Sequence, residues 1–377
     1  MKRIFLLTFL LLSFSVKFFG QNQDVIKIGV FVDLTGQTWE FGQATKNGIE
    51  LAAKEINDDG GINGKKIHLI FEDDQGRPET AQRVVKKLVS VDKVDAVLGE
   101  VASTNSLAAA PVAQAAKIPM ISSASTNPKV TEIGDYIFRA CFVDPFQGEA
   151  MAKFAFNQLK LRRVAILYDV NSDYSKGLLN NFKKTFTASG GKIINEQSYT
   201  QNDPDFKAQL KTIRKLKPDA MYIPGYYGQT SIIAKQARQL KMNFPLLGGD
   251  GWDSPEIWKL GGNALKNSYI TNHFASDNSS PAVKNFVAKY SAKFGSNPDS
   301  LAALAYDTMH LLAGALKRAN STDGKILRDA LAQTKNFEGV TGRITRFDES
   351  RNAIKPVIIL KLQPEASRFV YHATIEP

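Results

Sequence analysis

Apolar and polar positions follow two recurring patterns along the chain, one typical of buried strands and one typical of amphipathic helices. The stretch VIKIGVFVD at 25–33 is β-branched and apolar and ends in a turn, as expected for a buried strand. The stretch GIELAAKEIN at 48–57 carries its apolar residues on one helical face, and a glycine-rich turn then leads to another expected strand at 66–72. The pattern therefore predicts repeated strand and helix units.

This alternation runs through most of the chain and restarts after Pro145. Alternating strands and helices fold as parallel sheets covered on both faces, and two consecutive doubly wound units predict two lobes. Further strands are expected at 96–99, 119–122, 163–168, 192–197, 220–223, 245–247 and 357–362. Further helices are expected at 79–89, 150–159, 206–216, 229–240, 282–294, 301–320 and 324–334. One more helix is expected to begin after 104, and a long one is expected to end at 189.

The N-terminus has the composition of a secretory signal peptide. Two basic residues, Lys2 and Arg3, precede a largely apolar stretch at 4–16. That stretch is shorter than the about 20 residues of a membrane-spanning helix, and no later window is apolar enough to serve instead. We expect residues 1–20 to be cleaved off before Gln21, which places the mature protein in the periplasm.

Length and charge narrow the class of protein. Removal of 20 residues from 377 leaves 357, more than one hydrophobic core usually organises, so two domains are expected. The only cysteine, Cys141, leaves no intrachain disulfide and no lipid acceptor near the signal peptide. The formal net charge is +11, but the basic residues are scattered among acidic ones without a basic block. We therefore expect a freely released protein without a nucleic-acid partner.

A doubly wound sheet can also carry an enzyme, which is the main alternative from another class. The sequence has no GxGxxG after the first strand and no GxSxG, HExxH or CxxC motif. Its four histidines share no spacing typical of metal ligands. We expect no catalytic residue, no metal and no cofactor.

Seven motifs stand in order along the chain: IKIGVFVDLTG at 26–36, KNGIELAAKEINDDGGINGKKI at 46–67, VLGEVAST at 97–104, IPMISSASTNP at 118–128, AILYDVNSDYSKG at 165–177, PGYYGQ at 224–229 and GGDGW at 248–252. Any one of them alone would be unspecific. Their joint order and spacing cover nearly the whole mature chain and resemble the leucine, isoleucine and valine binding family of periplasmic binding proteins, which supply ABC importers.

The resemblance implies an α/β fold of two doubly wound parallel-sheet lobes joined by a three-strand hinge, the type I periplasmic binding protein architecture. The chain would cross between the lobes near 143–145, 273–275 and 345–348. The first lobe would comprise 24–143 plus 275–345, and the second 144–274 plus 346–377.

A free amino acid presents a carboxylate and an ammonium, so its site needs hydrogen-bond donors and an anionic or carbonyl partner. Ser103 and Thr104 lie between a strand end and a predicted helix, where unpaired backbone N–H groups and the helix dipole favour an anion. Their hydroxyls could equally cap that helix. The loop at 122–126 follows a short strand, at the edge where open parallel sheets gather ligands, although a serine-rich turn is usually a solvated loop.

The resemblance assigns roles to residues of these two segments. Ser103 would donate to the ligand carboxylate, and the Ala124 carbonyl would accept from the ammonium. Thr126 would contact the carboxylate through its backbone N–H and the ammonium through its hydroxyl, with Ser125 beside it in the loop.

Asp250 matches the acidic residue that pairs with the ammonium in family members that bind amino acids. An acid flanked by glycines is more often a turn former, and the resemblance is what favours the ligand role. Relatives carry Glu at this position, so the shorter Asp leaves the identity of the amino acid open. Removing an acid that serves only the ligand would leave the melting temperature of the empty protein nearly unchanged.

Aromatic residues are expected around the side chain of the ligand. The resemblance places Phe41 of the first lobe there, with Tyr174 and Tyr226 of the second. Trp39 and Trp252 could join them or be ordinary packing residues. Phe41 lacks the hydroxyl that some relatives have at this position, which favours an aliphatic or aromatic ligand.

Together these features predict a monomeric extracytoplasmic protein that closes around a small amino acid, branched-chain or otherwise aliphatic or aromatic. It would deliver this ligand to the membrane permease of an ABC importer. Binding of an amide, urea or an aromatic acid by the same fold remains an alternative, as does a small-molecule enzyme.

Overall fold

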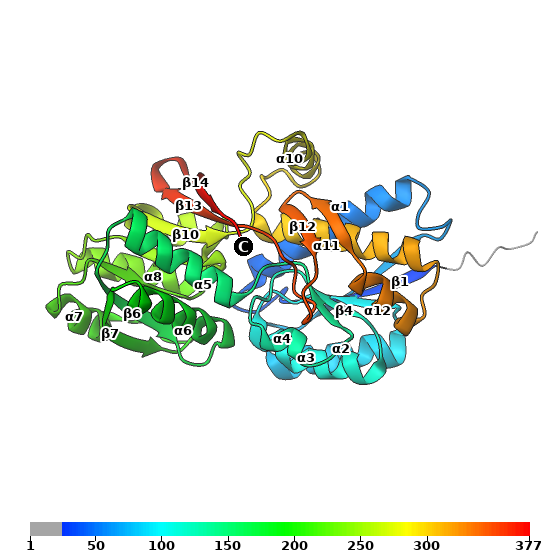
Figure 1. Ribbon diagram of the computed structural model, residues 1–377, viewed down its shortest axis with the longest axis horizontal. Coiled ribbons are helices and arrows are strands. Elements are labelled where there is room, and N and C mark those ends of the chain that lie inside the picture. Colours follow the sequence, from blue (N-terminus) through cyan, green and yellow to red (C-terminus); the bar gives the residue numbers. More distant parts are fainter. Residues whose placement is uncertain (1–24) are drawn as a thin grey trace, which may run out of the picture.

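The computed structural model describes residues 25–377, so the predicted signal peptide lies outside the described residues. Figure 1 shows two α/β lobes lying side by side. Between 25 and 377, none of the helices has both the length and the hydropathy that a membrane span requires.

Five parallel strands form the sheet of the first lobe, in the order β2-β1-β3-β4-β5. Helices cover both faces of this sheet, which explains why the apolar run of β1 does not alternate with polar residues. The strands are β1 (Ile26–Val32), β2 (Ile67–Asp73), β3 (Ala96–Leu98), β4 (Met120–Ser122) and β5 (Ile137–Arg139). The helices are α1 (Trp39–Asp58), α2 (Pro78–Lys87), α3 (Ser103–Ala116) and α4 (Lys129–Glu132).

Seven strands form the sheet of the second lobe, in the order β14-β13-β10-β9-β8-β6-β7. The strands are β6 (Arg163–Asp169), β7 (Lys192–Tyr199), β8 (Ala220–Tyr222), β9 (Leu246–Gly248), β10 (Ser268–Asn272), β13 (Val357–Gln363) and β14 (Arg368–Ile375). The helices are α5 (Asp144–Lys153), α6 (Asp173–Ala188), α7 (Lys207–Lys215), α8 (Tyr227–Gln239) and α9 (Glu256–Gly261). Five strands are parallel, whereas β13 is antiparallel to both of its neighbours. The short connection from β13 to β14 accounts for the antiparallel direction of that pair, because parallel strands need a long crossover.

The chain returns to the first lobe after β10 with α10 (Pro281–Phe294), α11 (Ser300–Ala319) and α12 (Gly324–Ala332), followed by the hairpin β11 (Lys335–Gly339) and β12 (Gly342–Arg346). α11 packs along α1, as Figure 1 shows. The two backbones approach closely at Gly48, where a Cβ atom would overlap the carbonyl oxygen of Ala302. A helix that the sequence separates from α1 by about 240 residues therefore completes the first lobe.

Three segments connect the two sheets, and the last one differs from the sequence prediction. Residues 347–353 still pack on the first lobe: the ring of Phe347 lies 5.6 Å from that of Phe138, and Arg351 donates to the carbonyl of Thr131 at 2.7 Å. Ile354 also exchanges backbone hydrogen bonds with β12, and Lys355 donates to Thr341. We therefore propose that the second lobe resumes at β13 rather than at 346. These contacts join positions far apart in sequence, so periodicity did not reveal them.

Most predicted elements are present with shifted ends, but some were missed. α1 begins at Trp39 and α5 at Asp144, several residues before the predicted starts at 48 and 150. The predicted helices at 79–89 and 150–159 each finish in a π-helical turn, at 88–92 and 154–158. The sequence analysis did not identify β5, β10, β11, β12, β14, α4 or α9, which are short or lack a clear period.

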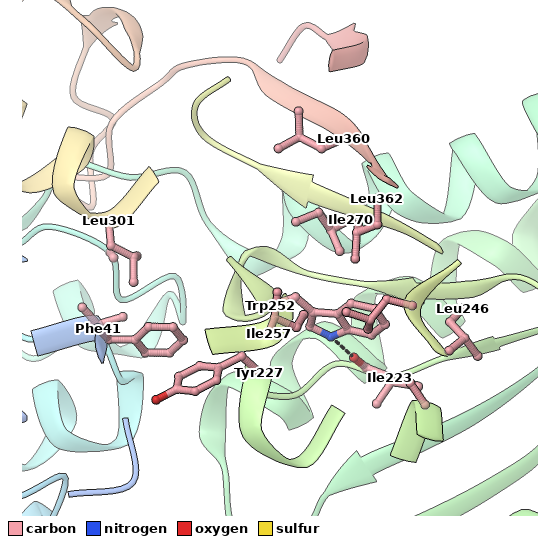
Figure 2. Close-up of a cluster of buried hydrophobic side chains, with 14 of the residues drawn as sticks. Phe41, Ile223, Tyr227, Leu246, Trp252, Ile257, Ile270, Leu301, Leu360 and Leu362 are labelled. Atoms are coloured by element: carbon pink, nitrogen blue, oxygen red, sulfur yellow. Dashed lines mark hydrogen bonds between the residues drawn. The ribbon is translucent and has the colours of Figure 1, made fainter. Parts of the chain in front are cut away.

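The largest hydrophobic cluster extends from one lobe to the other. Figure 2 shows Phe41 and Leu301 of the first lobe facing Tyr227 of the second, with the aliphatic core of the second lobe beyond. Trp252 lies fully buried within that core, where its indole N–H donates to the carbonyl of Ile223 at 3.0 Å. The lobes thus meet through apolar side chains beside the site described next.

Candidate ligand-binding site between the lobes

The predicted site residues lie where the carboxyl ends of the first-lobe strands face the second lobe. Ser103 is the first residue of α3, and the loop containing Ala124 and Thr126 follows β4. From the second lobe, Tyr174 stands in the first turn of α6 and Tyr226 immediately before α8. Asp250 opens the short 3₁₀ helix η3 (Asp250–Trp252) after β9.

Ser103 connects the start of α3 to the neighbouring loop. The N-cap position of α3 is Ala102, so the alternative that Ser103 or Thr104 caps this helix is not what the structure shows. Instead, the Ser103 hydroxyl accepts a hydrogen bond from the backbone N–H of Asn127 at 3.3 Å. Its own proton remains for a further acceptor.

The loop after β4 contains one residue that holds the loop in place and one whose hydroxyl lies beside a buried acid. Ser125 receives a hydrogen bond from Arg139 on its carbonyl, and its hydroxyl donates to the carbonyl of Glu100 at 2.9 Å. Its backbone N–H donates to Ser122, so the structure gives Ser125 a role in holding the loop rather than in facing a ligand. The Thr126 hydroxyl, by contrast, is buried beside the Asp144 carboxyl, whose pKa it lowers.

Asp250 accepts three hydrogen bonds from side chains of the second lobe and the hinge. Gln147 and Tyr174 donate to its Oδ1 at 2.7 and 2.8 Å. His273 Nε2 lies 2.9 Å from its Oδ2. Sequence reasoning assigned no ligand-site role to Gln147 or His273, since neither belongs to a motif that it singled out, although His273 is the first residue of the predicted crossing at 273–275.

The protonation of these donors follows from their burial. Burial lowers the pKa of His273, which favours the neutral ring, with its proton on the nitrogen that faces Asp250. Burial also raises the pKa of Tyr174 well above its usual value, so its hydroxyl keeps the proton that it donates. The partners of Asp250 are therefore neutral dipoles, which leave the carboxylate uncompensated by a positive charge.

A second buried acid lies close to this cluster. Asp144 begins α5, where its carboxyl lies beside the Thr126 hydroxyl. Burial raises the pKa of Asp144 to about 8, helped by the charge of Asp250. At neutral pH Asp144 is therefore predominantly protonated and adds little negative charge to the site.

The three predicted aromatic residues meet between the lobes. The ring of Phe41 stands edge-on to that of Tyr226, with 5.6 Å between centroids. Tyr226 in turn stacks on Tyr174 at 5.2 Å. The two tryptophans do not join this group: Trp39 is 44% exposed, and Trp252 belongs to the core shown in Figure 2.

Polar contacts also join the lobes across the cleft. The Asn127 side chain donates to the carbonyl of Asp173 at 2.8 Å, and Thr104 bonds to the same residue. On another side Gln37 donates to the Asn202 side chain at 2.7 Å. The lobes are therefore closed on each other.

Across residues 25–377, no group of three or more His, Cys, Asp or Glu side chains has the arrangement to hold a metal ion.

A family model described as periplasmic binding protein matches residues 25–367. Among curated proteins, the Leu/Ile/Val-binding protein BraC3 of Rhizobium johnstonii is 31% identical over 322 residues, which cover 85% of this chain and 87% of that protein.

Two solved structures are similar over nearly the whole described chain. The leucine binding protein LivK of Thermotoga maritima has a TM-score of 0.89 and 38% identity, covering 94% of this chain and 99% of the other. The branched-chain amino acid transporter substrate binding protein LivJ of Streptococcus pneumoniae, in complex with isoleucine, has a TM-score of 0.88 and 33% identity. The similarity covers 94% of this chain and 100% of the LivJ chain.

Proposed function

The chain belongs to the periplasmic binding protein family, and from that premise we propose that it is an extracytoplasmic solute-binding protein for a free amino acid. The ligand would be held between the lobes and delivered to the membrane permease of an ABC importer. The similarity to BraC3, LivK and LivJ, whose names refer to leucine, isoleucine or branched-chain amino acids, favours a branched-chain ligand.

The observation that carries this proposal is the arrangement of unlike poles on the two lobes. The first lobe offers the Ser103 hydroxyl and the loop that contains Ala124 and Thr126 at the end of its sheet. The second lobe offers the Asp250 carboxylate, whose side-chain partners are neutral. Donors on one side and an anion on the other suit the carboxylate and the ammonium of a zwitterion.

The aromatic group formed by Phe41, Tyr174 and Tyr226 supports an apolar ligand side chain. Apolar area removed from water contributes about 25 cal/mol per Å², so a leucine-sized side chain enclosed by these rings would add about 2 kcal/mol. This contribution favours larger aliphatic ligands over alanine or glycine.

The closed conformation of the lobes would signal to the importer that a ligand is bound. A ligand shifts the balance between open and closed states only by binding the closed state more tightly. In the proposed site Asp250, Tyr174 and Tyr226 reach a ligand docked on the first lobe only when the lobes meet, and the three connecting segments act as the hinge.

We also propose that the protein is not an enzyme. The Cys141 thiol is the chain's only one, and burial raises its pKa to about 12, which leaves it without a reactive thiolate. An assay for hydrolysis of small amides and esters tests this point, since turnover above that of a heat-denatured sample would contradict it.

Export through a cleaved signal peptide completes the proposal. The mass of the protein recovered from the periplasm should correspond to a chain that starts at Gln21. Recovery of the full-length chain from the cytoplasm alone would contradict this part.

The decisive experiment is native mass spectrometry of freshly purified protein, followed by calorimetric titration with amino acids and with benzoate. We expect leucine, isoleucine or valine to bind and benzoate, which has no ammonium, to fail. Binding of benzoate without any amino acid would favour the aromatic-acid alternative and contradict the proposed role of Asp250.

A further inference from the structure

Asp144 is a buried acid that holds one residue of the proposed site. It is the first residue of α5, next to the first connection between the lobes, and it is fully buried. Its backbone N–H donates to the carbonyl of Thr126 at 2.9 Å, and its carboxyl lies beside the hydroxyl of the same residue. Asp144 therefore contacts Thr126 through both the backbone and the side chain.

The second lobe leaves space for this carboxyl at a glycine. A Cβ atom at Gly177 of α6 would stand 2.3 Å from Oδ2 of Asp144 and 3.3 Å from Nδ2 of Asn127. The position therefore accepts no side chain while Asp144 keeps its place. The carboxyl is enclosed between α6 of the second lobe and the loop after β4 of the first, away from water.

The positive charge that acts on Asp144 is engaged elsewhere. It belongs to Arg139 at the end of β5, whose guanidinium donates to the backbone carbonyls of Ser125 and Asn127. The other ionisable groups that act with Asp144 are Asp250, the Cys141 thiol and the Tyr222 hydroxyl. Burial raises the pKa of that thiol and of that hydroxyl, so both are neutral at pH 7.

Asp144 and Asp250 are thus two acids beside one cleft. When two buried carboxyls share a site, the charge of one makes ionisation of the other unfavourable. Asp250 accepts hydrogen bonds from three side chains, which favours its ionised form. Burial, with the charge of Asp250, raises the pKa of Asp144 to about 8, so Asp144 is the acid that keeps its proton at pH 7.

The ammonium of a bound amino acid would change this balance. In the proposed site it would lie against Asp250 and the Thr126 hydroxyl, and that hydroxyl is the neighbour of Asp144. A positive charge within about 4–6 Å favours the ionised form of a carboxyl. The ligand carboxylate would lie at Ser103, where the backbone N–H groups at the start of α3 offset its charge.

The hydrogen-bond capacity of Thr126 points in the same direction. A hydroxyl has two lone pairs and one proton, so an oxygen that accepts from an ammonium still donates its own proton to another acceptor. An ionised carboxylate is a stronger acceptor than a neutral carboxyl. A ligand ammonium on Thr126 and a negative charge on Asp144 therefore favour each other.

We propose that amino acid binding releases the Asp144 proton, and that the resulting carboxylate directs the Thr126 hydroxyl so that its oxygen accepts from the ligand ammonium. The O–H bond of the carboxyl breaks, its electron pair stays on the carboxylate, and the proton passes to the buffer. Asp144 is then a positioning residue that acts on the ligand through Thr126. This inference rests on the proposed function, because it needs an ammonium at this place.

Release of a proton makes affinity depend on pH. Higher pH favours a reaction that releases a proton, so leucine affinity rises until the pH exceeds the pKa of Asp144 in the empty protein and levels off above it. With a pKa of about 8, affinity increases about fivefold from pH 7 to pH 8. His273 is already neutral in this range and does not contribute.

The test is calorimetric titration of the wild-type protein with leucine at pH 7, in phosphate and in Tris, two buffers with different ionisation enthalpies. The difference between the two binding enthalpies gives the number of protons released. We expect about 0.5 to 1 proton per leucine. Titrations at pH 7 and pH 8 measure the change in affinity.

Three variants separate proton release from structural support. Asp144→Asn has no proton to release, so its leucine enthalpy should not depend on the buffer and its affinity should be equal at pH 7 and pH 8. Thr126→Val removes the hydroxyl and should reduce the release, whereas Thr126→Ser restores the hydroxyl and should restore the release. Asp277→Asn, the same substitution at an exposed loop position, is the matched control and should behave like the wild type.

Melting temperatures confirm that each variant is folded. Should leucine bind the wild type with the same enthalpy in both buffers, the inference is refuted and the proposed function stands. Proton release that persists in Asp144→Asn would assign the proton to another group and would also refute the inference. Should no amino acid bind at all, the proposed function fails, and the inference fails with it.

Discussion

His273 and Asp250 are joined by a 2.9 Å hydrogen bond between Nε2 and Oδ2, and the histidine ring stacks on Phe142 at 3.6 Å. Phe142 lies in the first connection between the lobes and His273 in the second. The acid proposed to hold the ligand ammonium is therefore in direct contact with the hinge. Ligand binding at Asp250 and movement of the hinge would act on the same pair of residues.

Removal of Asp250 should affect both ligand affinity and stability. Asp250→Ala should cost about 2 to 5 kcal/mol of amino acid binding free energy, because the ammonium would lose its charged partner. It would also leave the buried donors of Gln147, Tyr174 and His273 without their acceptor. The free energy of unfolding of the empty protein should therefore fall by about 1 to 3 kcal/mol, contrary to the sequence-based expectation of an unchanged melting temperature.

Titration calorimetry and thermal melting without ligand measure these two effects. Asp277→Ala, at an exposed loop position, should change neither quantity. A variant at position 250 that melts like the wild type would show that the three hydrogen bonds contribute nothing net.

His273 should make ligand affinity depend on pH. Burial lowers its pKa, so the ring is neutral at pH 7 and becomes charged only below the usual value of about 6.5. A charged ring would offset the Asp250 carboxylate and weaken its attraction for the ligand ammonium. Leucine affinity should therefore fall once the pH drops below the usual histidine pKa, and His273→Gln, which retains an N–H donor, should flatten this dependence.

The exposed residue His68 gives the control, because His68→Gln should keep the wild-type pH profile. The role assigned to His273 is wrong if its substitution leaves the slope of affinity against pH as steep as before.

Asp144 should make stability depend on pH in the opposite direction from a salt-bridged acid. Its pKa is about 8 in the folded protein and about 3.9 in the unfolded chain, so folding favours its protonated form. Its stabilising contribution is fully present below about pH 4 and is lost as the pH rises through 8. Asp144→Asn should therefore raise the free energy of unfolding relative to wild type more at pH 8 than at pH 5, with a difference between the two gains on the order of a few kcal/mol. The melting temperature should rise accordingly.

Melting curves at both pH values decide this prediction. Glu365→Gln, which neutralises an exposed acid, should show no such difference between the two pH values. A gain from Asp144→Asn that is equal at pH 5 and pH 8 would mean that Asp144 does not titrate in this range.

The close approach of α1 and α11 should not tolerate a methyl group. Gly48→Ala would place a Cβ atom against the Ala302 carbonyl, and overpacking of this kind costs typically about 1 to 3 kcal/mol. Gly314→Ala within α11 meets only the end of the flexible Arg318 side chain and should be neutral or stabilising by up to about 1 kcal/mol. Chemical denaturation of the two variants gives the comparison, and equal stabilities would contradict the packing described here.

Closure should be visible in solution. Addition of leucine should reduce the radius of gyration measured by small-angle scattering, because the ligand favours the closed lobes. Gln37→Ala removes the hydrogen bond to Asn202 across the cleft and should weaken leucine affinity by about two- to fivefold. Gln333→Ala, at an exposed position after α12, should leave affinity and compaction unchanged. A radius that stays constant on saturation with leucine would exclude the clamp mechanism.

Local patterns in the sequence determined the fold class and most of the helices and strands. Buried parallel strands such as β1 and amphipathic helices such as α8 have short-range periodicities, and burial of their apolar residues depends on that pattern. The order of motifs indicated a resemblance to a family. That resemblance predicted that Phe41, Tyr174 and Tyr226 surround the ligand, and the structure brings these three rings together.

The tertiary structure alone decided which polar groups meet. Gln147, His273 and Asp250 come from α5, the end of β10 and η3, and their hydrogen bonds join positions up to 103 residues apart in the chain. Ser125 became a support for its loop because Arg139 of β5 and Glu100, which follows β3, reach it from other parts of the sheet. Hydrogen bonds depend on distance and direction to within fractions of an ångström, which a pattern of residue types does not specify.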